Sequence, residues 1–167
     1  PPSGTNGDGQ TVGYACEVLK RFKPTFSVVY LSSVDGCHSN FTNYLQNLHS
    51  ADHAVGHLWD YIQNQIPEMA NNTAIVVSPE HGRNLEPNRI KDANAFYGYD
   101  HSDSNARRVF NLMAGPGIDS NLVIGNQANG VGDIINITPT IAEILGFKQD
   151  MNNSGLVYNN NSLFDLI

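Results

Sequence analysis

Five side chains of the kinds that bind metal ions stand in polar stretches of the sequence. They are Asp35, His38, Glu80, His81 and His101. Carboxylate oxygen and neutral imidazole nitrogen are the ligands that zinc, manganese and iron take from proteins. Taken singly, an Asp-x-x-His or Glu-His pair is also explained by a turn with a surface histidine. If the fold brings all five together, they could hold two metal ions.

Two further groups could take part in chemistry. His49, His53 and His57 recur every four residues, a spacing that presents imidazoles on one face of a helix. No glutamate lies beside them in that helix and apolar residues surround them, so we interpret them as a structural boundary face. Arg83 follows His81 closely, and its forked guanidinium could bind a substrate oxyanion, although a surface role also explains an arginine there.

Alternating strands and helices must position these side chains. Apolar periodicity and capping residues predict helices at 10–22, 41–65 and 138–145. Short β-branched and aromatic runs predict strands at 25–31, 73–77, 108–114 and 121–124. Apolar periodicity disappears between 84 and 105, which predicts a long loop.

This alternation predicts an α/β fold, with a mixed or mostly parallel sheet and helices on both of its faces. Ligands of such folds bind beyond the carboxyl ends of the strands. The first pair, Asp35 and His38, follows one predicted strand, and Glu80 and His81 follow the next, so we expect them at one edge. We expect residues 1–9 to form a linker and residues 10–167 to form a single α/β domain.

Composition narrows the possible partners. The chain has 9 basic and 16 acidic residues and a net charge of −7, which argues against a nucleic-acid backbone or an anionic membrane as partner. Its only cysteines, Cys16 and Cys37, are too few for a disulfide scaffold. The beginning of the sequence lacks both an initiator Met and a signal peptide, so we expect a processed or excised piece of a longer protein.

The order of these motifs resembles the carboxyl-terminal half of the alkaline phosphatase superfamily. That superfamily includes sulfatases, nucleotide pyrophosphatase/phosphodiesterases and cofactor-independent phosphoglycerate mutases. The resemblance covers about residues 25–147. Its most specific parts are His81-Gly82 after a strand, the Ala114-Gly115-Pro116-Gly117 turn and the helix that begins at Thr138-Pro139-Thr140.

The resemblance implies a divided metal site. Asp35, His38 and His101 would match the ligands of one metal ion. Glu80, in place of the usual aspartate, and His81 would match the pair that holds a second. It further implies two divalent ions (zinc, manganese or calcium) in the intact protein, of which this chain alone would bind at most one tightly.

The resemblance also implies that a further aspartate and a Ser or Thr nucleophile lie upstream, since this chain contains no convincing copy of either. We therefore expect the carboxyl-terminal portion of a metal-dependent phosphate- or sulfate-ester hydrolase, inactive without its upstream half. Its substrate would be a small-molecule, nucleotide or glycan ester, and a secreted or periplasmic location is favoured. The alternative is a non-catalytic metal-binding or structural domain with a degenerate alkaline-phosphatase-like fold.

Overall fold

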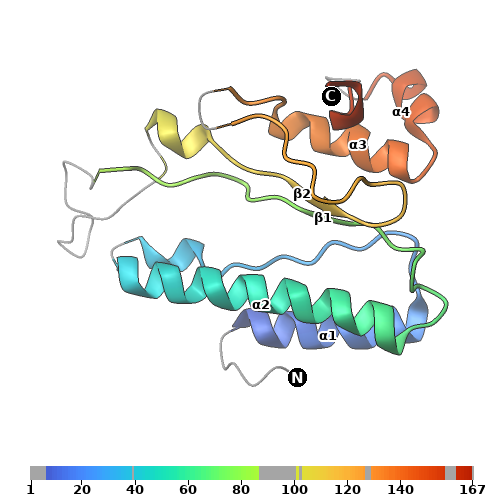
Figure 1. The fold of residues 1–167 in the computed structure, drawn as a ribbon, viewed down its shortest axis with the longest axis horizontal. Coiled ribbons are helices and arrows are strands. Elements are labelled where there is room, and N and C mark those ends of the chain that lie inside the picture. Colours follow the sequence, from blue (N-terminus) through green and yellow to red (C-terminus); the bar gives the residue numbers. More distant parts are fainter. Residues whose placement is uncertain are drawn as a thin grey trace.

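The computed structural model describes residues 7–38, 40–86, 101, 103–126, 129–156 and 161–166. Its α-helices are α1 (Gly7–Phe22), α2 (Phe41–Gln65), α3 (Ile137–Ile144) and α4 (Lys148–Ser154), and its strands are β1 (Ile75–Val77) and β2 (Leu112–Ala114). Short 3-10 turns are η1 (Asp35–Cys37), η2 (Ser104–Arg107), η3 (Ile134–Asn136) and η4 (Leu163–Leu166). Figure 1 shows α1 and α2 below the strands and α3 and α4 above them, so helices do lie on both sides of the sheet.

The main core lies between α1 and α2. Apolar residues recur at spacings of three and four on the facing sides of both helices, which buries one stripe of each. The buried cluster consists of Val12, Cys16, Leu19, Ala54, Leu58, Ile62 and Ile66. Both helices were predicted from this periodicity, and α2 has the predicted bounds. Among the described residues, no helix is both long and apolar enough to cross a bilayer.

Helix α1 begins earlier than predicted. It starts at Gly7, within the stretch expected to be linker, and Asp8 in its first turn is only 1% exposed. The Asp8 carboxylate accepts hydrogen bonds from the backbone amides of Ser32 and Ser33, at 3.0 and 3.2 Å. The first turn of α1 is therefore held by residues more than twenty positions away, which local sequence patterns do not show.

The sheet differs from the prediction. Its two strands are antiparallel, with Ile75 opposite Ala114 and Val77 opposite Leu112. The described residues therefore contain none of the expected parallel pairing. Parallel neighbours need a crossover connection, usually a helix. The described part of the connection from β1 to β2 contains the 3-10 turn η2 but no α-helix.

Two predicted strands do not form. The segments 25–31 and 121–124 are not strands, and no backbone hydrogen bond joins 25–31 to any other described segment. A β-branched run favours an extended chain, but a strand also requires a partner at hydrogen-bonding distance. The strands predicted at 73–77 and 108–114 do form, shortened to β1 and β2.

Candidate metal centre

The loop that carries Asp35 and His38 is fastened to helix α2. Asn47 of α2 donates one hydrogen bond to the carbonyl oxygen of Ser33, at 2.6 Å, and another to the sulfur of Cys37, at 3.1 Å. His38 directly follows the Asp35–Cys37 turn η1, shortly before α2 begins. This arrangement directs both side chains of the Asp-x-x-His pair to one end of α2, where the carboxylate of Asp35 and Nε2 of His38 lie 3.2 Å apart.

The second loop follows β1 and fixes the orientation of His81. Nδ1 of His81 lies 2.7 Å from the carbonyl oxygen of Gly82. Because a carbonyl oxygen only accepts, Nδ1 carries the hydrogen, and in the neutral ring Nε2 keeps its lone pair. The amide of Gly82 donates to the carbonyl of Ala106 at 2.6 Å, which holds this loop against η2.

Three hydrogen bonds hold Asp103 and Asn105, which follow His101, against the same loop. The amide of Asp103 donates to the side-chain oxygen of Asn84 at 2.9 Å, and the carboxylate of Asp103 accepts from the amide of Leu85 at 3.2 Å. Asn105 donates to the carbonyl of Arg83 at 2.8 Å. Residue His101 is thereby placed beside the loop after β1, although some twenty positions separate the two in sequence.

The structure brings all five predicted residues together. Nε2 of His81 lies 3.5 Å from Oδ1 of Asp35 and 3.2 Å from Oε1 of Glu80. The imidazole centroid of His101 lies 4.2 Å from that of His81 and 5.8 Å from that of His38. Asp35 thus contacts both His38 and His81. The family resemblance implies that these two histidines bind different metal ions.

The donor chemistry of this cluster fits a divalent cation. Carboxylate oxygens face imidazole nitrogens there, and two acceptors at such distances need a proton or a metal ion between them. Ligand atoms about 2.0–2.2 Å from one tetrahedral zinc ion lie roughly 3.3–3.6 Å apart, close to the separations around Asp35. Nevertheless, within the described residues no group of three or more His, Cys, Asp or Glu side chains is arranged to hold a metal ion. The fit therefore concerns pairs of ligands and not a complete coordination shell.

Arg83 links the two ligand loops. Its Nη1 and Nη2 donate to the backbone carbonyls of Cys37 and His38, at 3.2 and 3.1 Å. The guanidinium carbon also lies 4.4 Å from the centre of the Tyr44 ring on α2. Sequence reasoning missed this link because the carbonyls it bonds are more than forty positions away. The predicted role of Arg83 in binding a substrate oxyanion stays a prediction.

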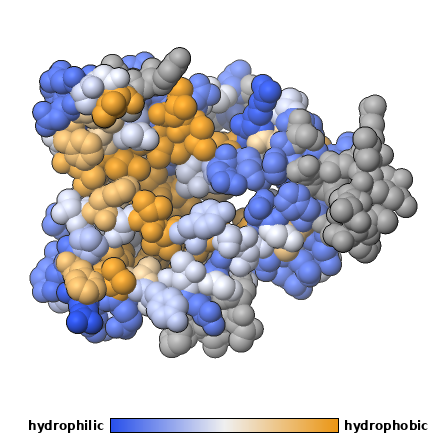
Figure 2. Space-filling model, turned by 180° about the vertical axis from the view of Figure 1, so that it is seen from behind, coloured by the Kyte–Doolittle hydropathy of each residue, from blue (hydrophilic) through white to orange (hydrophobic). Residues whose placement is uncertain are grey.

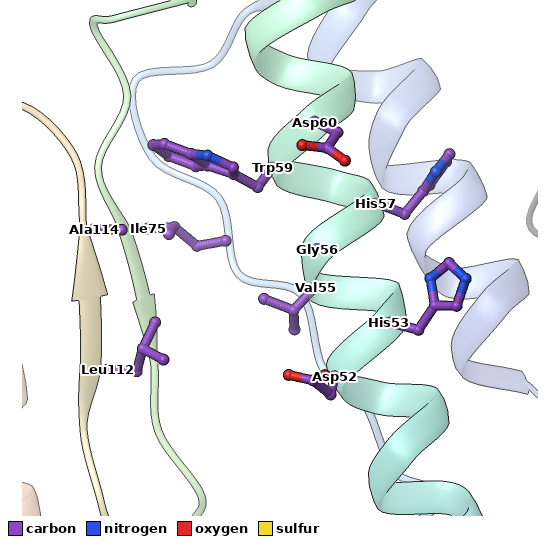
Figure 3. Close-up of a pocket in the computed structure, with 10 residues that line it drawn as sticks. All are labelled: Asp52, His53, Val55, Gly56, His57, Trp59, Asp60, Ile75, Leu112 and Ala114. Carbon is purple, nitrogen blue, oxygen red and sulfur yellow. The ribbon is translucent and has the colours of Figure 1, made fainter. Parts of the chain in front are cut away.

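A separate pocket lies between α2 and the strands (Figure 3). It has a volume of about 430 Å³, and Trp59 and Val55 of α2 point from one side toward Ile75 and Leu112 on the other. His53 and His57 also line it, but Figure 3 shows their rings turned away from the strands. None of the five candidate ligands lines this pocket, so it is distinct from the metal centre.

Comparison with known families identifies the family of this chain. The family model for type I phosphodiesterase / nucleotide pyrophosphatase matches residues 10–114, more than half of the 167-residue chain, and includes all five candidate ligands. Comparisons with curated proteins and with solved structures gave no significant match. The chain therefore belongs to the type I phosphodiesterase / nucleotide pyrophosphatase family, a branch of the alkaline phosphatase superfamily.

Proposed function

We propose that this chain carries part of the metal site of a hydrolase that cleaves phosphate or sulfate esters of small molecules, nucleotides or glycans. One observation carries the proposal, the contact of Asp35 with both His38 and His81. The two loops that meet there come from different parts of the chain, and both follow extended segments. Two imidazoles sharing one carboxylate form a donor set suited to a divalent cation.

Each residue of the cluster has a separate task in this proposal. Asp35, His38 and His81 would bind the cation, and Glu80 and His101 border it. The carbonyl of Gly82 holds the His81 ring with Nε2 toward Asp35, in the way that a hydrogen-bond acceptor on the other ring nitrogen orients many metal-bound histidines. When bound, the divalent cation supplies positive charge that stabilises the oxyanions of a phosphate or sulfate ester.

The nucleophile and further ligands would come from elsewhere. We propose that a region upstream in the same polypeptide supplies a Ser or Thr hydroxyl and a carboxylate, as the family resemblance implies. The rival proposal is a non-catalytic domain, which the exposure of the Glu80 side chain (66%) and the incomplete ligand shell favour.

Calorimetric titration with zinc near neutral pH tests the proposal. The full chain is expected to bind one ion, and Asp35→Ala and His81→Ala are each expected to weaken binding by more than about tenfold. His53→Ala, which removes an imidazole outside the cluster, serves as the matched control and should leave the affinity unchanged. Equal loss in His53→Ala, or no loss in Asp35→Ala, would contradict the proposal.

Activity assays address the missing nucleophile. The chain alone is expected not to hydrolyse p-nitrophenyl phosphate, bis-p-nitrophenyl phosphate or p-nitrophenyl sulfate faster than buffer. Turnover that chelator abolishes and His81→Ala removes would show that the chain already contains a complete site, against the proposed upstream source.

A further inference from the structure

The pocket between α2 and the strands has apolar walls. Val55 and Trp59 of α2 form one wall, Ile75 and Leu112 form part of the other, and about 430 Å³ lies between them. Small-molecule sites in proteins are mostly apolar clefts of about 300–1,000 Å³ with a few polar groups at defined places. The pocket is therefore large enough for a small organic molecule, and its polar groups decide which kind.

Two carboxylates border the pocket along α2. Asp52, Gly56 and Asp60 follow one another at intervals of four residues, so they form one row on the helix. Eight residues of α-helix make this row about 12 Å long, and Figure 3 shows Asp52 and Asp60 at its two ends. Gly56 has no side chain, and nothing lies within 4 Å of a Cβ built there. The middle of this rim is therefore open.

The negative charge of the rim is not balanced within the pocket. Asp52 and Asp60 are both exposed, and exposed aspartates are ionised at neutral pH. Neither forms an ion pair with another described residue. The ten residues that line the pocket include no lysine or arginine, and the rings of the two histidines among them turn away from the strands. A positively charged ligand would thus meet two carboxylates there.

Trp59 gives a second reason to expect a cation. Its ring points from α2 toward the strands and is only half-buried. The face of an aromatic ring attracts ammonium groups, and tryptophan does so more strongly than tyrosine or phenylalanine. Apolar surface by itself does not select the charge of a ligand, and Figure 2 shows such surface gathered over one broad face of the molecule. The carboxylates and the indole ring are what give the pocket its selectivity.

We propose that this pocket binds a small organic cation, an amine with an apolar body. The apolar body lies between Val55 and Leu112, and the ammonium group lies at the rim that Asp52 and Asp60 form. The inference goes beyond the proposed function, because none of the five candidate metal ligands lines the pocket. Binding there requires neither a metal ion nor ester hydrolysis.

Three probes of equal length and different charge test the proposal: 4-phenylbutylamine, 4-phenylbutanol and 4-phenylbutanoate. Each is titrated into the full chain in the presence of chelator, and NMR follows the indole N–H of Trp59, the only tryptophan. The amine should bind at least about fivefold more tightly than the alcohol, because one ionic contact at about 4 Å in water changes a dissociation constant by about this factor. The carboxylate should bind more weakly than the alcohol.

Variants of α2 show whether the rim causes this preference. Asp52→Asn and Asp60→Asn should each weaken binding of the amine, and the double variant should bind it no more tightly than the alcohol. Asp150→Asn is the matched control, since it removes the same charge from an exposed aspartate on α4, in the opposite helical layer. Gly56→Leu, which adds a side chain in the middle of the rim, should weaken the binding of all three probes.

Several results would overturn the proposal. One is equal binding of the alcohol and the amine, which would make the pocket a site for neutral apolar groups. Others are an unchanged preference for the amine in the double variant, an equal loss in Asp150→Asn, or a Trp59 signal that does not respond to the amine at millimolar concentrations. Because every titration is made without metal, a failure here leaves the metal-site proposal intact, and a failure of zinc binding leaves this proposal intact.

Discussion

Replacement of Arg83 by methionine is expected to separate the two ligand loops and destabilise the fold. Methionine keeps much of the apolar stem but removes the hydrogen bonds to the carbonyls of Cys37 and His38 and the contact with Tyr44. Hydrogen bonds from charged groups contribute about 1.5–3 kcal/mol when buried. Arg83 is only half-buried, so we take about 1 kcal/mol for each bond and about 0.5 kcal/mol for the ring contact.

The expected loss is therefore about 2.5 kcal/mol. Urea unfolding measures it, with the fluorescence of Trp59, the only tryptophan, as the probe. With a slope of about 2 kcal/mol/M, the midpoint should fall by roughly 1.2 M. Arg83→Lys should recover part of the loss, because an ammonium can bond one carbonyl but does not span two as a guanidinium fork does.

Arg107→Met is the matched control, since Arg107 is an exposed arginine at the end of η2. It should shift the midpoint by less than about 0.5 kcal/mol. If Arg83→Met behaves like this control, the Arg83 link does not hold the loops together. If Arg83→Lys has the same urea midpoint as the unaltered chain, the positive charge alone explains the stabilisation. The hydrogen bonds of the guanidinium to two carbonyls would then not be needed.

Two further predictions concern other parts of the fold. Gly82→Ala should lower the free energy of unfolding by about 1–3 kcal/mol, because a Cβ there would lie 2.7 Å from the carbonyl oxygen of Arg108. Gly56→Ala on α2 is the control and should cause no such loss, because nothing lies within 4 Å of the added Cβ. Equal urea midpoints for the two variants would contradict this prediction. Lys148 donates to Asp165 and Glu143 at 2.6 and 2.7 Å and lowers the pKa of both carboxyls. Groups with a lowered native pKa stabilise the fold above their unfolded pKa, about 4, and lose that contribution as the pH falls through the native pKa. As the pH is lowered below about 4, the melting temperature of Lys148→Met should therefore fall less than that of the unaltered chain. An equal fall would show that the contacts of Lys148 with Glu143 and Asp165 do not control the acid sensitivity.

Much of the helical part was predictable because helix signals are local. The apolar spacing of three and four residues in α1 and α2 specifies which side is buried, whatever the rest of the chain does. The polar residues after 25–31 and after β1 were likewise identifiable as a candidate site, because residue type alone decides whether a side chain can bind a cation. The five candidate residues could thus be chosen without coordinates.

Tertiary structure decided the features that depend on residues far apart in sequence. Strand pairing is one of them, since 25–31 and β1 have similar β-branched composition, but among the described residues only β1 has a hydrogen-bonded partner strand. The contact of Asp35 with His81 and the link from Arg83 to the carbonyls of Cys37 and His38 each cross more than forty positions. Sequence patterns determine which groups are able to bond, whereas distance and direction in the folded chain determine which of them do.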